Sequence, residues 1–316
     1  MLPIRPEYGT GVRTLTGTDA AGFTIGNKGY ICGGYNGKTT RLADTWEYDI
    51  DNDWWTQRAD MPGTVRNAAT GFSVGSKGYV TTGYNPDQKY LSDTWEYNPE
   101  TNSWRQMDDF KGGARYYALG FGIDNYGYVG TGYNDNYLKD FYRFDPTAAA
   151  GSQWTIVNGF GGQKRQGGTA FVIDGKAYVC GGQNNNSDVS DFWCFDPSAA
   201  TPWTQLRDIA NTSDDDYDDD YTSIVRSYGV SFVIDGKAYL TLGSTAGGSY
   251  YSNYWIYDPA TDLWEGDDLT AFEGSTRIHA VCFSTGTRGI VATGGSGSSS
   301  YFDDAWELKP YEYEEE

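Results

Sequence analysis

One arginine recurs about every 50 residues along this chain of 316 residues. A guanidinium group carries a planar fork of donors that fits a carboxylate or another oxyanion. Six such side chains around one opening would therefore form an anion-binding site. In the alternative interpretation, each arginine forms an ion pair with an aspartate of its own repeat. The candidate arginines are Arg13, Arg66, Arg115, Arg165, Arg226 and Arg277, and the candidate aspartates are Asp44, Asp93, Asp140, Asp191 and Asp304.

A second recurring feature is a tyrosine followed by an asparagine. Aromatic faces suit the C–H surfaces of sugars, and amides suit hydroxyl groups or peptides. The alternative is turn chemistry, because asparagine tolerates a positive φ. The fourth repeat has Gln183 and Asn184 at this place, and the fifth and sixth repeats have neither residue type, so we expect a ligand to lie off the axis, toward the first four repeats. The tyrosine pairs number three. They are Tyr35 and Asn36, Tyr84 and Asn85, and Tyr133 and Asn134.

The histidine and cysteine content predicts no metal centre. His279 is the only histidine and lies among small residues, so we expect it to be packed in the core. With a single histidine, no Ser/His/Asp catalytic triad can be selected from the sequence. We predict that the protein binds no metal and no cofactor. The cysteines show no C-x-x-C spacing, so we expect four free buried thiols. These are Cys32, Cys180, Cys194 and Cys282.

Acidic residues are concentrated in an insertion at 212–220 and in a tail at 309–316. Clustered carboxylates suit Ca²⁺, but the insertion lacks the glycine and the alternating ligands of a known calcium loop. We therefore expect a solvated, mobile loop. The net charge of −20 argues against nucleic acid as a partner, because binding phosphates requires a basic surface.

The chain contains no apolar run near the roughly 20 residues that a membrane-spanning helix needs. No charged and then apolar leader precedes Leu2, so we expect any signal sequence to be absent from this chain. We expect a monomer whose partner is a small polar or anionic ligand or another protein.

The elements that position these residues follow from a repeating unit. In the second repeat, strands are expected near 68–74, 78–82 and 94–97, and a fourth starts at Trp104. Four antiparallel strands form one sheet with two aromatic faces, and both faces must be covered. The sequence therefore predicts an all-β, six-bladed β-propeller. A glycine that closes an apolar run marks each repeat, at Gly34, Gly83, Gly132, Gly182, Gly243 and Gly294.

The ends of the chain predict how the ring closes. The sixth repeat stops after three strands, and residues 2–5 are expected to supply its fourth strand, so that the N-terminal segment removes an open edge. A small residue stands three positions beyond each arginine, as at Ala69 and Gly168, and we expect these residues to line the axis. The whole chain, 1–316, is one predicted propeller domain, with repeats near 17–66, 66–115, 115–165, 165–226, 226–277 and 277–308.

These units resemble kelch repeats. The resemblance rests on the glycine-ended second strand, an aromatic third strand ending in Tyr-Asp-Pro as at 257–259, and the tryptophan that follows. It covers roughly residues 13–308. The motif Asp-Thr-Trp-Glu-Tyr most resembles the repeats of bacterial exported kelch-repeat lipoproteins. This resemblance implies a periplasmic, cell-surface or secreted location.

Three kinds of kelch protein suggest different activities. Galactose oxidase-like enzymes hold copper with two histidines, and His279 alone cannot build that site. Sialic acid mutarotases are six-bladed and accept an acidic sugar in the central mouth. Kelch adaptors of ubiquitin ligases hold acidic peptides with arginines, but their partner domains are missing here.

We therefore predict a binding or interaction protein of the bacterial envelope, which holds a sugar, a sugar acid or an acidic peptide at the arginine-ringed mouth. The alternative is a sugar-acid isomerase or mutarotase.

Overall fold

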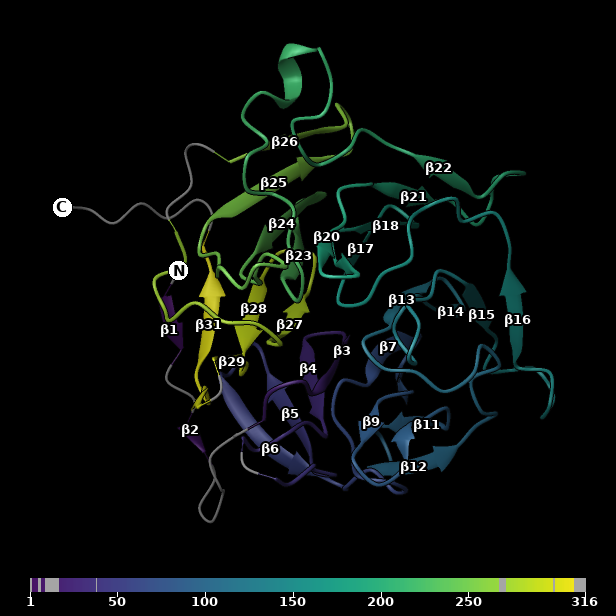
Figure 1. Ribbon diagram of the computed structural model, residues 1–316. Helices are drawn as coiled ribbons and strands as arrows, with labels where there is room; N and C mark the ends of the chain where they lie inside the picture. Colours follow the sequence, from purple (N-terminus) through teal and green to yellow (C-terminus); the bar gives the residue numbers. More distant parts are fainter. Residues whose placement is uncertain are drawn as a thin grey trace.

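The computed structural model describes residues 2–4, 7–8, 17–37, 39–266, 271–297 and 299–309. Six β-sheets are arranged around a central axis (Figure 1). The first strand of each sheet contacts the first strands of both neighbouring sheets, and the sixth contacts the first, so the ring is closed. These inner strands are β3 (Ala21–Ile25), β7 (Thr70–Val74), β13 (Leu119–Ile123), β17 (Thr169–Ile173), β23 (Val230–Ile234) and β27 (Val281–Ser284).

Each sheet is one blade built on four antiparallel strands, as predicted. Blade 2 contains β7, β8 (Lys77–Thr81), β11 (Thr94–Asn98) and β12 (Ser103–Gln106), in spatial order β12-β11-β8-β7. These bounds lie close to the ranges expected from the sequence. Among the described residues there is no α-helix, and the single 3-10 turn η1 spans Asp216–Asp218.

The other blades repeat this order. Blade 1 adds β4 (Lys28–Cys32), β5 (Thr45–Asp49) and β6 (Trp54–Arg58), and blade 3 adds β14 (Tyr126–Gly130), β15 (Phe141–Phe144) and β16 (Trp154–Val157). Blade 4 adds β18 (Lys176–Cys180), β21 (Trp193–Phe195) and β22 (Trp203–Gln205), and blade 5 adds β24 (Lys237–Thr241), β25 (Tyr254–Asp258) and β26 (Leu263–Glu265). Blade 6 adds β28 (Gly289–Ala292) and β31 (Ala305–Leu308).

Short hairpins extend three of the connections between second and third strands. They are β9 (Tyr84–Asn85) with β10 (Lys89–Tyr90), β19 (Gln183–Asn184) with β20 (Ser187–Asp188), and β29 (Gly295–Ser296) with β30 (Ser300–Tyr301).

The N-terminal segment completes blade 6. Strand β1 (Leu2–Ile4) runs antiparallel to β31, with Leu2 opposite Glu307 and Ile4 opposite Ala305. This confirms the predicted closure and covers the outer edge of β31. Strand β2 (Glu7–Tyr8) was not predicted: it lies parallel to β6 as a fifth strand of blade 1. Arg13, a predicted ligand-binding residue, and most of the acidic tail (310–316) lie outside the described residues.

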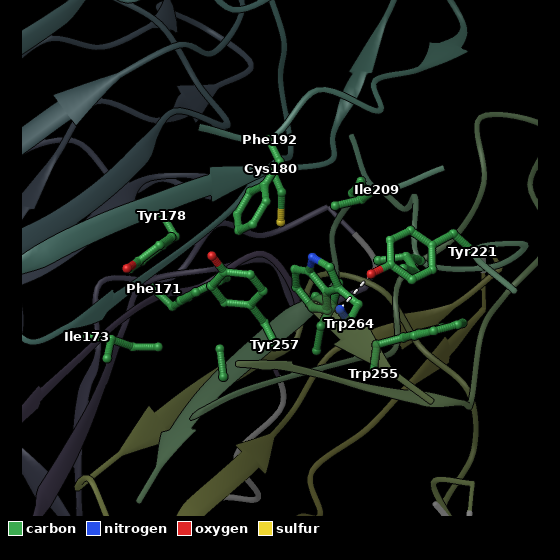
Figure 2. Packing of buried hydrophobic residues seen from close by; sticks show 13 residues of the cluster. Phe171, Ile173, Tyr178, Cys180, Phe192, Ile209, Tyr221, Trp255, Tyr257 and Trp264 are labelled. Carbon is green, nitrogen blue, oxygen red and sulfur yellow. Dashed lines mark hydrogen bonds between the residues drawn. The ribbon is translucent and has the colours of Figure 1, made fainter. Parts of the chain in front are cut away.

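The core lies between the blades and is largely aromatic. Figure 2 shows the interface of blades 4 and 5, where Phe171 and Tyr178 pack against Tyr257, with ring centroids 6.0 and 5.3 Å away. The Trp264 ring packs against Tyr257 in a tilted arrangement, with centroids 5.2 Å apart, and the backbone N–H of Trp264 donates to the Tyr221 hydroxyl at 2.7 Å. Each blade has two aromatic faces, and both are buried only when a blade packs on each side of it. A closed ring gives every blade two such neighbours, which stabilises the propeller.

The acidic insertion is only partly the solvated loop expected from the sequence. Five of its aspartates are exposed, but Asp218 is fully buried. The Asp218 carboxylate accepts hydrogen bonds from the backbone N–H groups of Thr212 and Ser213, both at 2.9 Å. Its neighbour Tyr217 packs against the core between blades 4 and 5. Asp218 therefore holds the turn of the insertion together, and Tyr217 anchors the insertion to the propeller.

Candidate functional site

Five of the six recurring arginines are described, and each is buried in its own blade with at most 1% of its surface exposed. Arg66 is typical: Nη1 and Nη2 donate to the two carboxylate oxygens of Asp93, each at 2.6 Å. Nε and Nη1 also donate to the backbone oxygens of Thr64 and Thr82, at 2.9 and 3.0 Å. Equivalent ion pairs join Arg115 to Asp140, Arg165 to Asp191, and Arg277 to Asp304.

This geometry favours the structural alternative for the arginines. Ligand binding by them stays an untested prediction, and it would require a buried guanidinium to become accessible. Their backbone oxygens also join neighbouring blades: the oxygen of Arg66 accepts the N–H of Gly34 at 2.8 Å, and that of Arg115 accepts the N–H of Gly83 at 2.8 Å. The marker glycine is required there, because Gly83 has a φ of +112° and an added Cβ would lie 3.0 Å from the Cβ of Ala69.

Blade 5 departs from this pattern because its third strand is preceded by an amide. Arg226 Nη2 donates to Asn253 Oδ1 at 3.0 Å, and no carboxylate neutralises it within the described part of the chain. Burial lowers the pKa of Arg226 to about 10. The position before the first strand of blade 5 therefore holds a charged arginine whose partner is neutral.

Six residues form a ring at one end of the channel, which we call the throat ring. In blades 2 to 6 each of them lies two positions beyond the recurring arginine, and Asp19 takes the aligned place in blade 1. All six have a left-handed backbone with φ between 52° and 61°. Backbone N–H···O bonds of 2.7 to 3.2 Å link five neighbouring pairs around the axis. This conformation is costly for residues other than glycine, but here the surrounding bonds stabilise it. The members are Asp19, Ala68, Tyr117, Gly167, Tyr228 and His279.

The throat ring surrounds a cavity of about 140 Å³. The small residues predicted to line the axis do so, and they alternate with the ring members around this cavity. A second cavity of about 340 Å³ lies among the opposite ends of the inner strands, between residues such as Phe72, Phe171 and Ser231. The polar side chains of the ring therefore gather at one end only.

An aspartate–histidine contact crosses the throat between blades 6 and 1. His279 Nδ1 lies 2.9 Å from Asp19 Oδ1, and the Tyr117 hydroxyl donates to the same oxygen at 2.7 Å. Asn67 Nδ2 lies 3.5 Å from Asp19 Oδ2. Burial alone would raise the pKa of Asp19, but the charge of His279 and these hydrogen bonds lower it below the ordinary value. Asp19 is therefore held as a carboxylate.

The imidazole of His279 is fixed by aromatic rings. The Tyr117 ring stacks on it at 5.2 Å, and the Tyr228 ring meets it edge-on at 4.4 Å. Nε2 of His279 is buried and has no hydrogen-bond partner in the described part of the chain. Gln166 and Gln183 both donate to the Tyr228 hydroxyl, at 2.8 and 2.7 Å. His279 is packed as the sequence interpretation expects, but it is not enclosed in the core, because it lines the cavity with 18% of its side chain exposed.

Beside the throat, blades 2 and 3 carry a group of half-buried tyrosines that we call the tyrosine shelf. Tyr116 is its centre, with ring centroids 5.6 to 5.8 Å from three other members and 4.8 Å from Tyr117 of the throat ring. Burial raises the pKa of Tyr116. The shelf thus offers aromatic faces next to the polar throat. Its members are Tyr84, Tyr90, Tyr116, Tyr133 and Tyr137.

Arg41, in the connection between β4 and β5, lies at the edge of the shelf. Its guanidinium carbon is 4.3 Å from the Tyr35 ring centroid and 5.7 Å from that of Tyr84. Nε donates to Asn67 Oδ1 at 2.7 Å. Since Asn67 also contacts Asp19, one polar network runs from Arg41 at the mouth to His279 in the throat.

The predicted tyrosines and asparagines separate into two roles. Tyr84 and Tyr133 belong to the shelf, and Tyr35 supports Arg41. Asn85 serves its turn, since Oδ1 accepts the N–H groups of residues 87 and 88 and Nδ2 donates to the Val65 oxygen. Asn36 likewise accepts the N–H of residue 40, and the N–H of Asn134 donates to the oxygen of residue 136. Asn36 and Asn85 therefore stabilise turns through side-chain hydrogen bonds, but neither has the positive φ that the sequence interpretation expected.

Sequence reasoning missed the throat ring and Arg41. A signal for the ring was present: two positions beyond the arginine, the second to sixth repeats carry alanine, tyrosine, glycine, tyrosine and histidine, and the first repeat has Asp19 at the aligned place before Ala20. A position that varies between otherwise similar repeats marks a place where the blades differ in role. Arg41 has no counterpart in the repeats, so no periodic signal could reveal it.

Two further observations concern the described residues alone. No group of three or more His, Cys, Asp or Glu side chains is placed to hold a metal ion there, and no helix among them has the length and apolarity to cross a membrane. All four cysteines are free, as predicted, but only Cys32 and Cys180 are fully buried.

Comparisons with known proteins agree with this architecture. No curated protein matches the sequence. Of 716 matching chains of solved structures, one described as "Structure of YjhT" has a TM-score of 0.75 and 15% sequence identity, and the match covers 93% of this chain and 98% of that chain. That likeness shows the fold alone. The family model of the KLHDC2/KLHL20/DRC7 Kelch-repeats domain matches residues 9–160, and that of the Kelch motif matches residues 164–206. The chain therefore belongs to the kelch-repeat β-propeller family.

Proposed function

We propose that this propeller is a binding protein for a hydroxyl-rich polar ligand, a sugar or sugar acid, at the mouth formed by the tyrosine shelf and the throat ring. The observation that carries the proposal is the contact of Tyr116 with Tyr117, at 4.8 Å, which joins an aromatic surface to a polar cavity. Aromatic faces pack against C–H surfaces, and a few convergent polar groups fix orientation.

The polar groups beside the shelf fit hydroxyl groups. Asp19 lines the cavity with a carboxylate and Tyr228 with a hydroxyl. Amides of Asn67, Gln166 and Gln183 hydrogen-bond to these two residues. A cavity of about 140 Å³ is small, so it accepts one end of a ligand whose remainder lies on the shelf. An acidic peptide shares some of this chemistry, but a sugar uses the hydroxyl-binding groups as well.

The test is a calorimetric binding screen with neutral sugars, sugar acids and acidic peptides. Tyr116→Ala should weaken binding of the hit about tenfold or more, which corresponds to about 1.4 kcal/mol. Tyr126→Ala is the matched control, because Tyr126 lies under Arg143 on blade 3, away from the shelf. Equal affinities of the two variants, or binding of acidic peptides alone, would contradict the proposal.

A second candidate is the sugar-acid isomerase or mutarotase. It is favoured by the pairing of Asp19 with His279 Nδ1, which orients the imidazole and leaves Nε2 without a protein partner. A carboxylate that orients a histidine in this way is a common arrangement for acid–base catalysis. Opening a cyclic hemiacetal needs removal of the proton from the anomeric hydroxyl and delivery of a proton to the ring oxygen.

The enzyme candidate predicts faster exchange of sugar-acid anomers in magnetisation-transfer NMR. His279→Gln should abolish this acceleration while the ligand still binds. If the wild-type protein binds the sugar acid and leaves its anomer exchange unchanged, the protein is a binding module and not an isomerase.

We also propose that the protein acts in the bacterial envelope, a location supported by the resemblance of its repeats to exported kelch proteins. Fractionation of cells that express the full native gene is the test. Recovery of the protein only with cytoplasmic markers would refute this location.

A further inference from the structure

We propose that Arg41 binds the carboxylate of an acidic ligand at the mouth, in place of the buried arginines of the repeats. The inference deepens the proposed function and rests on it for the identity of the ligand as a sugar acid. The structural basis for Arg41 as an anion site is independent of that identity.

Arg41 differs from the five buried arginines in its partners. Each of those donates from Nη to backbone oxygens and to an aspartate or asparagine of its blade. Arg41 donates from Nε to Asn67, and no hydrogen bond from its Nη1 or Nη2 is found within the described part of the chain. It also has no carboxylate within 4.0 Å among those residues. Its fork of terminal donors is therefore available.

The surroundings hold this fork in place. The guanidinium lies over Tyr35 at 4.3 Å and near Tyr84 at 5.7 Å, and the 2.7 Å bond to Asn67 fixes its rotation. Arginine that is already oriented loses less conformational freedom when it forms a bidentate contact with a carboxylate. A ligand bound there contacts the tyrosine shelf on one side and the throat on the other.

The charge of the site favours a monoanion. One guanidinium balances one carboxylate, and Asp19 is linked to Arg41 through Asn67, so a dianionic phosphate would meet repulsion. A carboxylate also matches the planar fork in a two-point contact. The ligand class is therefore a monocarboxylic acid, such as a uronic acid, and not a phosphorylated sugar.

The experiment is NMR of the arginine Nε–H signals during titration with acetate, glucuronate, glucose and inorganic phosphate. The Arg41 signal is identified by its loss in Arg41→Gln. We expect it to shift saturably with acetate and glucuronate, and to respond more weakly to phosphate. Signals of Arg66 and Arg115 should not move, because their groups are buried and paired.

Affinities provide the second readout. Arg41→Gln should weaken glucuronate binding tenfold or more and leave the weaker affinity for glucose unchanged. Arg143→Gln is the matched control, since Arg143 lies 4.4 Å over Tyr126 on the outer part of blade 3. An Arg41 signal that is insensitive to both carboxylates, or an unchanged affinity of Arg41→Gln for acetate, overturns the inference. Acetate binding at Arg41 without binding of any sugar upholds the inference and refutes the sugar as ligand.

Discussion

Replacing Arg66 by alanine tests whether the recurring arginines belong to the scaffold or to the ligand site. The substitution removes four hydrogen bonds, two to Asp93 and one each to the backbone oxygens of Thr64 and Thr82. It leaves the Asp93 carboxylate, 21% exposed, beside an empty space where a buried cation stood. Trp95 Nε1 remains as a donor to Asp93, at 2.7 Å.

The expected cost follows from burial. Removing one partner of a buried ion pair destabilises a protein by about 3–5 kcal/mol, because the other charge is left buried and unpaired. Arg105→Ala is the matched control, since Arg105 pairs with Glu96 at 2.8 Å but is 65% exposed. Such an exposed pair contributes about 0–1 kcal/mol. With total stabilities of about 5–15 kcal/mol, the two variants should be well separated.

Urea unfolding followed by tryptophan fluorescence measures the difference. The pH dependence adds a second check, because burial raises the pKa of Asp93 but its bonds and charge interaction with Arg66 lower it overall. A carboxyl with a lowered pKa stabilises the folded state above its ordinary pKa of about 3.9, and this contribution is lost as the pH falls through the lowered value. The difference between Arg66→Ala and the wild type should therefore be full at neutral pH and shrink in acid.

The reasoning is refuted if Arg66→Ala unfolds at the same urea concentration as Arg105→Ala, or if it abolishes ligand binding while stability is unchanged. Should Arg66→Ala fail to fold, Asp93→Asn gives the same test in milder form. It copies the neutral partner of blade 5 and should cost about 1–2 kcal/mol, the difference between a charge-assisted and a neutral hydrogen bond.

Three further variants examine other parts of the fold. Asn253→Asp should stabilise the protein by about 1 kcal/mol in urea unfolding, because it gives the buried arginine of blade 5 a charged partner; a loss of stability would contradict this. Gly83→Ala should cost about 1–3 kcal/mol through strain and close contact, and more than Gly75→Ala, where an added Cβ meets open space; equal costs would count against the contact. Deleting β1 (Leu2–Ile4) should lower stability and cause self-association in light scattering, because it exposes the edge of β31; a stable, monomeric deletion variant would disprove the role of β1 in closure.

Much of the fold could be predicted from the sequence because each repeat forms the same blade and needs the same residue types at the same places. The marker glycine is needed for its positive φ, and the arginine is needed to bind the carbonyls and aspartate at the end of its blade. Local requirements of this kind recur at a fixed spacing and can be recognised without coordinates. The closure by Leu2–Ile4 was predictable for the related reason that the sixth repeat lacked one strand.

From the sequence, burial of the arginines in ion pairs was one of two interpretations, and the other was an anion-binding site. The same residue type at the same spacing suits an anion site or an internal ion pair, and the choice depends on whether Asp93 and its counterparts point back to the arginines. Only the packed blade, in which Arg66 is 1% exposed, decides this.

The sequence by itself determined the repeat, the blade and the closed ring, since these depend on contacts within a repeat or between adjacent repeats. The tertiary structure alone decided the candidate site. Asp19 and His279 stand near opposite ends of the chain and meet because blade 6 closes on blade 1. Arg41 is oriented by Asn67 and Tyr84 of the next blade. Such contacts across the axis and between blades do not recur from one repeat to the next. Each forms at a single place in the molecule, between side chains that different repeats contribute, so no sequence period reveals it.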